Sequence, residues 1–186
     1  FFFGRRNLIR RAWLLFQGLQ HSHGSPRILA VIGASGSGKS SLVRAGLLPE
    51  LARSPMEELE SPTVLILRPG SAPLSRLAEV VCRLPGAKDF TKLNLKTRGD
   101  SGEFDAVHQI LASCRESDRS RFVVVVDQFE ELFTECMDAT ARTAFLEQLA
   151  FAANHTDHLV SVVCTLRSDF AGVVDDVFGL LGQLFQ

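Results

Sequence analysis

The feature that most constrains this chain is a glycine-rich octapeptide between an apolar run and a helical pattern. Residues 33–40 read GASGSGKS, which matches the pattern G-x-x-x-x-G-K-[ST] in full. The run ILAVI before it predicts a buried parallel strand, and SLVRAGLLPEL after it predicts a helix. A glycine- and serine-rich linker that matched by chance would lack this context. The sequence therefore predicts a phosphate-binding loop.

Each residue type in this loop suits the binding of phosphate. Gly33, Gly36 and Gly38 have no Cβ, so the loop can take positive φ and bring backbone N–H groups close to phosphate oxygens. The helix that begins near Gly38 adds the positive end of its dipole. We expect Lys39 to reach the β- and γ-phosphates and Ser40 to offer its hydroxyl to Mg²⁺. The expected nucleotide-binding residues of the loop are Gly33, Ala34, Ser35, Gly36, Ser37, Gly38, Lys39, Ser40 and Ser41.

Apolar runs alternate with helical patterns along the rest of the chain. Strands are predicted at 28–32, 63–67, 122–127 and 159–167, and helices at 5–20, 41–51, 74–84, 103–115, 128–136, 139–153 and from 170 onward. This alternation predicts an α/β fold, a three-layer P-loop NTPase sandwich with a mainly parallel sheet. The chain starts without Met and stops in an apolar stretch, so we expect residues 1–186 to be one core excised from a longer protein.

An acidic residue follows the clearest of these strands. FVVVV runs from residue 122 to 126, and Asp127 comes directly after it. A P-loop needs a carboxylate at a neighbouring strand end to hold the metal through water, so Asp127 is the predicted metal partner of Ser40. The alternative is an Asp that caps the next helix.

The residues after Asp127 bear on hydrolysis. Many ATPases place Glu directly after this Asp to activate water, and here that position holds Gln128. Glu130 or Glu131 is then the candidate catalytic base, or Gln128 orients water without acting as a base. The alternative is that both glutamates are solvated residues in a first helical turn, where acids are favourable.

A third strand end carries polar residues. Thr165, Arg167 and Asp169 close the stretch LVSVVCTLRSDF. Ligands of open parallel sheets bind at this edge, so Arg167 is a candidate sensor of the γ-phosphate. The alternative is a surface arginine that begins a loop.

Composition and charge weigh against several classes of protein. A hydrophobic content of 46% indicates a folded globular chain, and a formal net charge of -1 argues against a broad grip on nucleic acid. Cys82, Cys114, Cys136 and Cys164 form no C-x-x-C pair, which favours small core residues in a reducing compartment. Neither a membrane-length apolar run nor a signal-peptide layout occurs. We expect a cytoplasmic protein that binds neither membranes nor nucleic acid.

Taken together, the motifs resemble a known family. FFGR (2–5), IGASGSGKSSLVRAGLLPEL (32–51), VVVDQFEELF (124–133) and VCTLRSDF (163–170) occur in the family's order, and LRPGSAPLSRLAE (67–79) also fits. They are similar to the novel STAND NTPase domain of bacterial signal-transduction NTPases, which is often fused to WD-type or other repeats. The extension SLVRAGLLP and the run DQFEELF are much more specific than a bare P-loop.

The resemblance implies ATP and Mg²⁺ as cofactors. It also implies that Phe3, Gly4 and Arg5 lie near the nucleotide base, with a solvated helix face as the alternative for Arg5. The family usually has Glu where this chain has Arg6, so an ion-pair or capping role at that position does not carry over.

For the catalytic residues, the resemblance links Asp127, and more loosely Glu130 and Glu131, to metal binding and hydrolysis, and it makes Arg167 a sensor. It further implies self-association in the ATP-bound state, with C-terminal sensor repeats and an effector domain outside this chain.

Two functions compete most directly. One is a regulated ATPase switch of a signalling or defence protein, in which ATP with Mg²⁺ favours an open, oligomerising state. The other is an oligomerisation scaffold that binds nucleotide and barely hydrolyses it, which Gln128 favours. A small-molecule kinase lacks a marked acceptor pocket, and a DNA-handling AAA-type ATPase lacks a DNA-reading motif.

Overall fold

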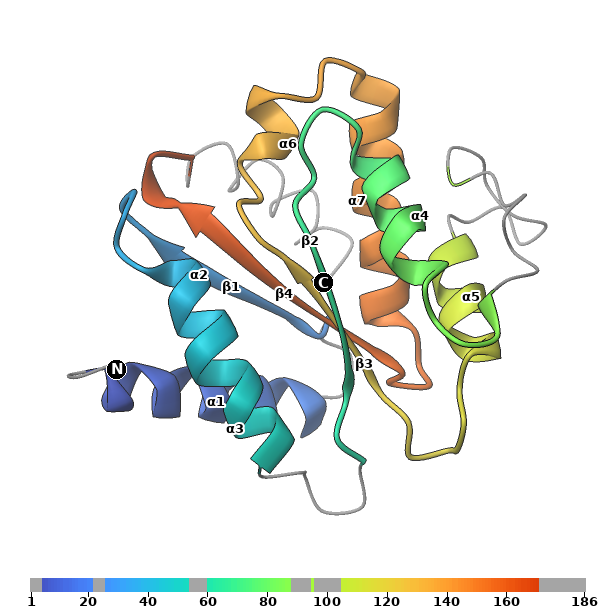
Figure 1. Ribbon diagram of the computed structural model, residues 1–186, viewed down its shortest axis with the longest axis horizontal. Helices are drawn as coiled ribbons and strands as arrows, with labels where there is room; N and C mark the ends of the chain where they lie inside the picture. The colour runs from blue at the N-terminus through green and yellow to red at the C-terminus, as the bar shows by residue number, and fades with distance from the viewer. Residues whose placement is uncertain (1–4, 22–25, 54–59, 88–94, 96–104, 171–186) are drawn as a thin grey trace.

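The computed structural model describes residues 5–21, 26–53, 60–87, 95 and 105–170 (Figure 1). Its elements are α1 (Arg6–His21), β1 (Ile28–Gly33), α2 (Lys39–Leu42), the π-helix η1 (Val43–Leu47), α3 (Leu48–Arg53), β2 (Thr63–Leu67), α4 (Pro73–Val81), α5 (Ala106–Ser113), β3 (Phe122–Val126), α6 (Glu131–Thr134), α7 (Ala139–Asn154), β4 (Val160–Arg167) and the 3₁₀ turn η3 (Ser168–Phe170). Strands and helices alternate for most of this length, as the sequence predicts.

The strands form one parallel sheet in the order β1-β4-β3-β2. All of β3 is buried, and so is β4 except for its last residue. The run in β1, which its continuous apolar residues predict to be buried, lies at an edge of the described sheet instead. Only Leu29 of β1 is buried, and Ile32 is 50% exposed. An apolar run alone does not distinguish an edge strand from a central one.

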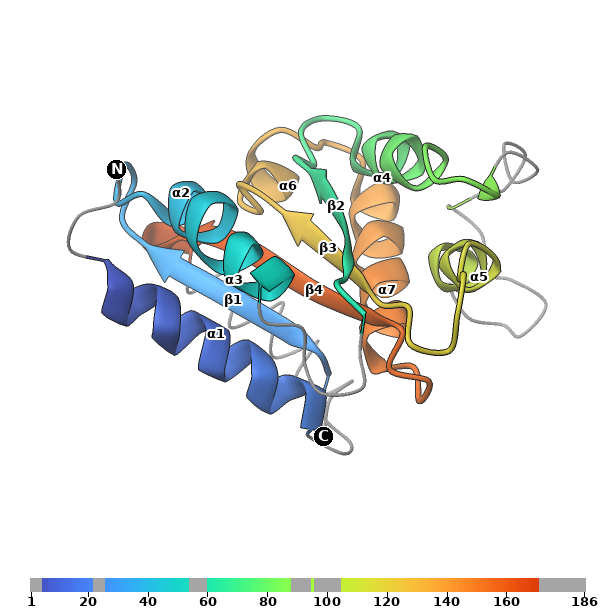
Figure 2. The same cartoon turned by 60° about the horizontal axis from the view of Figure 1, so that its bottom comes forward.

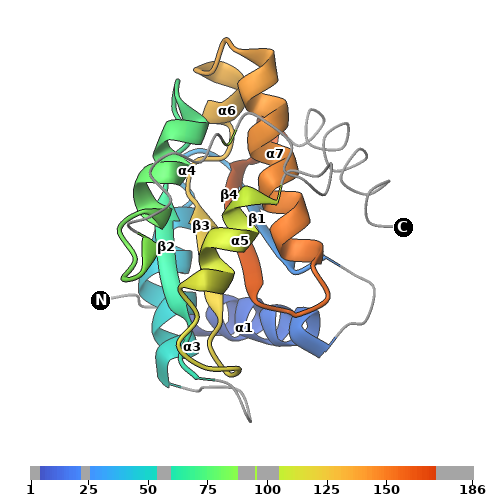
Figure 3. The same cartoon turned by 90° about the vertical axis from the view of Figure 1, so that its right-hand side faces the viewer.

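Helices cover both faces of the sheet, which gives the predicted three layers (Figure 2). Successive side chains of a strand point to opposite faces, so β3 contributes to two cores. Val123 and Val125 pack with residues of α1, η1 and α3, including Phe16 and Leu47. Val124 packs on the other face with residues of α4, α5 and α7. On that face α5 contacts both α4 and α7 (Figure 3).

The predicted helix after the P-loop forms, but it is not uniform. A π-helical segment, η1, separates α2 from α3. Pro49 has no N–H to donate to the carbonyl of Ala45, so a regular α-helical bond is missing at this point. The wider hydrogen-bond pattern lies in the turn before that proline, and π-helical turns often occur at functional sites.

The other predicted helices differ mainly at their ends. Helix α4 ends at Val81, three residues before the predicted end, and α6 is a short helix of four residues. The helix predicted from 170 onward lies outside the described residues beyond Phe170. Among the residues that the structure describes, no helix combines the length and the apolar character needed to cross a membrane.

The four cysteines are free thiols, as the sequence predicts. Cys136 and Cys164 are buried, whereas Cys82 and Cys114 are half-buried. Burial raises the pKa of the Cys164 thiol to about 12. This thiol is therefore protonated at neutral pH and behaves as a small apolar core residue.

Candidate nucleotide-binding site

Most of the predicted site residues that the structure describes converge at the carboxyl ends of the parallel strands. A pocket of about 530 Å³ opens there between the P-loop and the segments that follow β3 and β4. Its walls are formed by Ser35, Gly36, Gly38, Lys39, Ser40, Ser41, Gln128, Glu130, Glu131, Thr134, Glu135, Thr165 and Arg167. This is the edge at which open α/β sheets bind ligands.

The P-loop uses its glycines in two different ways. Gly36 and Gly38 have φ of 70° and 81°, in the left-handed region that suits residues without a Cβ. Gly33 does not share this conformation, which differs from the sequence prediction. A Cβ on Gly33 would lie 2.9 Å from Oγ of Ser37, so a larger residue there would require the Ser37 side chain to move. Gly33 thus allows a close approach within the loop, whereas Gly36 and Gly38 supply its left-handed turns.

Lys39 is the first residue of α2, and its side chain reaches back over the loop. Its Nζ donates hydrogen bonds to the carbonyl oxygens of Gly33 and Ala34, both at 2.8 Å. An ammonium group has three N–H donors, so one of them makes neither of these two hydrogen bonds. The positive charge of the group is not neutralised by the two carbonyl oxygens. This arrangement holds the ammonium in the pocket next to the loop.

Ser40 and Asp127 meet across the sheet edge, although 87 residues separate them. Oγ of Ser40 donates to Oδ1 of Asp127 over 2.6 Å, and Oγ1 of Thr165 donates to the same oxygen over 2.7 Å. The carboxylate does not cap α6, whose N-cap is Glu130. The hydroxyl of Ser40 gives its single proton to Asp127, so the lone pairs of its oxygen remain free for a metal ion. The pair therefore fits Mg²⁺, which prefers oxygen ligands.

Two arginines that were not among the predicted site residues also contact Asp127. Nη2 of Arg44, on η1, lies 2.9 Å from Oδ2, and Nε of Arg68, just after β2, lies 3.8 Å from it. A sequence signal exists for both. Arg44 follows Ser40 by four residues on a predicted helix, and Arg68 follows a strand whose carboxyl end lies at the same edge.

The candidate bases lie in the same pocket but in different surroundings. Glu130 is 8% exposed, and its Oε2 accepts the backbone N–H of Arg167 over 3.3 Å. Oε2 of Glu131 accepts the N–H of Gly70 over 3.2 Å. Burial and the nearby Glu135 carboxylate raise the pKa of Glu131, against the opposing influence of Gly70 and Arg68. Neither glutamate is a fully solvated surface residue.

Gln128 has an unusual backbone conformation. Its φ is 58°, which is uncommon for a residue with a Cβ, and its N–H donates to Oγ1 of Thr165 over 2.9 Å. Thr165, near the end of β4, is thus hydrogen-bonded both to Asp127 and to Gln128. Gln128 also lines the pocket.

Arg167 lies at the end of β4 and lines the pocket. Its Nε donates to Oδ1 of Asp169 over 3.1 Å, and its guanidinium lies 5.5 Å from the ring centroid of Phe170. The side chain is 41% exposed, so it has room to change partners.

The segment before α1 is described in part. Phe3 and Gly4 lie outside the described residues. Nη1 of Arg5 donates to the carbonyl of Gly38 over 3.3 Å, which brings this residue to the P-loop. Nη1 of Arg5 lies only 2.7 Å from the position that a Cβ on Gly38 would occupy.

Comparison with known proteins identifies the family of the chain and a protein of similar fold. The family model described as Novel STAND NTPase 1 matches residues 1–185. No curated protein matches the chain. A solved structure of the ORC2 protein of Aeropyrum pernix, in ADPNP–ADP complexes, is similar with a TM-score of 0.64 and 14% identity. The match covers 98% of this chain and 46% of that one, so this chain spans under half the length of its structural neighbour. At this identity the likeness shows the fold alone. The chain is a nucleotide-binding NTPase domain and belongs to the novel STAND NTPase 1 family.

Proposed function

We propose that this domain binds ATP with Mg²⁺, hydrolyses it slowly and acts as a molecular switch. The observation that carries the proposal is the 2.6 Å hydrogen bond from Ser40 to Asp127, beside Lys39 in the same pocket. In this proposal the backbone N–H groups of the P-loop and Lys39 hold the phosphates, and Ser40 and Asp127 hold the metal. Mg²⁺ would neutralise charge on the phosphate oxygens when bound.

Glu130 and Glu131 are the proposed sources of a base. Both line the pocket, and the raised pKa of Glu131 makes its carboxylate a stronger proton acceptor than that of an ordinary glutamate. Arg167 is the proposed γ-phosphate sensor, exchanging its contact with Asp169 for one with phosphate oxygens. A change of partner at the end of β4 would link nucleotide state to the segment that follows.

Membership of the STAND family supports the wider part of the proposal. We infer that the domain belongs to a longer signalling or defence protein, with sensor repeats and an effector, and that it self-associates when ATP is bound. The four free thiols support a reducing, cytoplasmic setting.

The first test is a titration of the 186-residue chain with a fluorescent ATP analogue, with and without Mg²⁺ and in competition with GTP and ADP. We expect tight, Mg²⁺-dependent binding with a preference for ATP. Lys39→Ala should weaken binding about 10- to 150-fold, because it removes a charge-assisted contact worth roughly 1.5–3 kcal/mol. Arg53→Ala, which removes an exposed cation on α3, is the matched control and should bind as the parent does. Equal binding by Lys39→Ala would refute the proposal.

Phosphate release in the same samples tests hydrolysis. Glu130→Gln and Glu131→Gln should each be assayed, with Glu79→Gln on the exposed face of α4 as control. A large loss of turnover in one of the first two, with binding retained, identifies the base. A scaffold with little hydrolysis is the second candidate, favoured by Gln128 next to Asp127. Tight binding without phosphate release from the parent chain would select it.

A further inference from the structure

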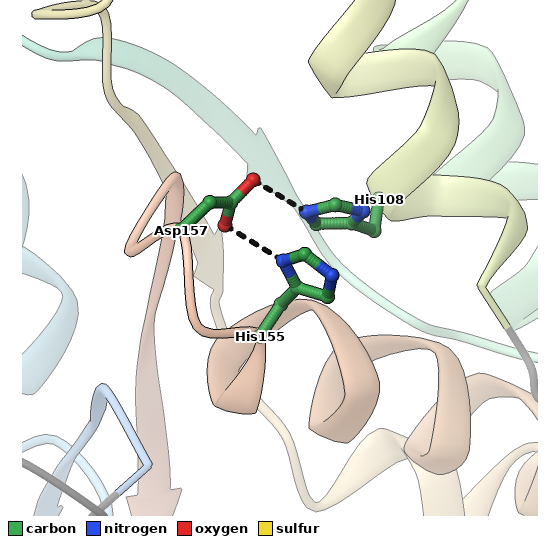
Figure 4. Close-up of side chains that lie close together, drawn as sticks. All are labelled: His108, His155 and Asp157. Atoms are coloured by element: carbon green, nitrogen blue, oxygen red, sulfur yellow. Dashed lines mark hydrogen bonds and ion pairs between the residues drawn. The ribbon is translucent and has the colours of Figure 1, made fainter.

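Three side chains of metal-ligating type meet at the amino edge of the sheet (Figure 4). His108 lies on α5, His155 is the C-cap of α7, and Asp157 lies in the loop that leads into β4. The P-loop follows β1, whereas Asp157 precedes β4, so this cluster lies at the opposite edge from the nucleotide site. We propose that His108, His155 and Asp157 form a second metal site that binds a transition-metal ion, with Zn²⁺ as the best fit.

The geometry is close to that of a coordination shell. Nε2 of His108 lies 2.9 Å from Oδ2 of Asp157, and Nδ1 of His155 lies 3.0 Å from Oδ1. The ligand atoms all lie within 4.8 Å of one another. A tetrahedral ion with bonds of about 2.1 Å separates its ligands by about 3.4 Å, which falls inside this range. Small side-chain rotations would therefore admit the ion.

One nitrogen of the cluster lacks a well-aligned hydrogen-bond partner. Nδ1 of His155 is buried and makes no hydrogen bond of acceptable geometry, in spite of its distance from Asp157. The carboxylate is close to this nitrogen but poorly aligned with it, so it satisfies the nitrogen only in part. The ring of His155 also lies over that of His108, with centroids 3.8 Å apart and planes inclined by 36°. A cation bound between the two rings would give Nδ1 of His155 a partner and would explain why the two imidazoles lie so close together, because neutral imidazole nitrogens are metal ligands.

The surroundings fix the ligands while leaving an entry path. The N–H of Leu159 donates to Oδ1 of Asp157 over 3.1 Å, and Nη2 of Arg27 donates to the carbonyl of His155 over 2.6 Å. Phe151 lies beside both imidazoles. The exposed fractions of the His108, Asp157 and His155 side chains rise from 9% to 25% and 36%. Two of the three side chains are thus partly exposed, so the cluster lies near the surface, where water can complete the coordination shell.

The types of ligand at the site discriminate between classes of metal. The cluster offers one carboxylate, and the charges of Arg27 and Arg121 act on Asp157. Mg²⁺ and Ca²⁺ depend on several oxygen ligands, so they are poorly served here. Two imidazole nitrogens with one carboxylate suit Zn²⁺, which gains more from nitrogen ligands. Such an ion would join α5 to the connection between α7 and β4.

The test is a titration of the tag-free, metal-stripped 186-residue chain with Co²⁺ in the absence of nucleotide, followed by competition with Zn²⁺. Co²⁺ replaces Zn²⁺ with similar geometry and is visible by its d–d absorption. We expect one Co²⁺ per chain, a tetrahedral or five-coordinate spectrum, and displacement by Zn²⁺ but not by Mg²⁺. His108→Gln and Asp157→Asn should each weaken binding by about 100-fold or more, at least as much as the loss of a supporting contact in known sites.

Two controls separate this site from others. His21→Gln removes a histidine at the exposed end of α1, and Lys39→Ala disables the phosphate site, so both should bind Co²⁺ as the parent does. His155→Gln, at the most exposed of the three ligands, provides a further variant if His108→Gln does not fold. The proposal is overturned if the parent chain binds no stoichiometric Co²⁺ or Zn²⁺, or if the ligand variants that fold bind as tightly as the parent.

Discussion

At the scale of single residues, the site depends on how one buried carboxylate is stabilised. Asp127 is 1% exposed, and burial alone would raise its pKa. Hydrogen bonds from Ser40 and Thr165, with the charges of Arg44 and Arg68, outweigh burial and lower that pKa below its ordinary value. The carboxylate therefore stays ionised at neutral pH, as its proposed role beside a metal ion requires. Because its pKa is lower when folded, it stabilises the fold above the unfolded value near 3.8.

The substitution Asp127→Asn measures how much the ionised carboxylate contributes to the stability of the fold. We expect a loss of about 1–3 kcal/mol in the free energy of unfolding at pH 7, since two hydrogen bonds lose their charged acceptor and Arg44 loses its partner. The difference from the parent should persist down to about pH 4 and shrink as the pH falls through the folded pKa of Asp127.

Urea unfolding of both proteins between pH 7 and pH 2.5, without nucleotide, measures this difference. Asp118→Asn is the control, because that side chain is fully exposed and should change stability by less than about 0.5 kcal/mol. A difference that stayed constant across the whole pH range would contradict the account of Asp127.

At the scale of elements, α1 is held to the P-loop helix by a close approach at Gly46. A Cβ at this position would lie 2.6 Å from Cγ1 of Ile9, a distance that side chains do not tolerate. The contact joins α1 to η1, the segment that carries Arg44. The position of α1 and the orientation of the Arg44 side chain are therefore coupled through Gly46.

Gly46→Ala should lower the free energy of unfolding by about 1–3 kcal/mol through overpacking against Ile9. Gly18→Ala on α1 is the matched control, because a Cβ there would meet nothing within 4 Å. In that helix the same substitution should raise stability by about 0.5–1 kcal/mol. Denaturant unfolding of the two variants compares them directly, and equal effects would argue against a tight α1–η1 contact.

Most elements could be predicted from the sequence because their patterns are local. TVLIL forms β2 over the predicted residues, and FVVVV forms β3. The half-exposure of β1 could not be predicted, since it depends on which strand lies beside it. The π-helical turn of η1 was also missed, although Pro49 was its signal. The contact of Arg44, a residue of η1, with Asp127 was therefore not predicted either.

At the scale of the whole molecule, a nucleotide that binds the assembled site should stabilise the entire domain. At 100 times its dissociation constant, ATP with Mg²⁺ should add about 2.7 kcal/mol to the free energy of unfolding. For a chain of this size that corresponds to a rise in Tm of about 5–10 °C. Thermal unfolding with and without ATP and Mg²⁺ measures the rise. Lys39→Ala should lose most of it at the same nucleotide concentration, and an equal rise in that variant would place the bound ATP elsewhere.

At this scale, the contacts that were hardest to predict join residues far apart in the sequence. The neighbouring positions of Ser40 and Asp127 could be expected from the P-loop pattern, because both follow parallel strands. The cluster of His108, His155 and Asp157 was missed, because α5 and the loop before β4 come together only in the folded chain. The H-x-D spacing of His155 and Asp157 was the available signal.

The strand order has a consequence for how the chain matures during synthesis. Strands β1 and β3 leave the ribosome before β4, but they are not neighbours, and β4 must insert between them. Until Arg167 has emerged, no sheet connects the P-loop to Asp127, and β3 presents an open edge to other chains. Under the proposed function, a nascent domain would hold nucleotide only once β4 is in place. Nucleotide binding would then mark a chain whose four described strands have paired.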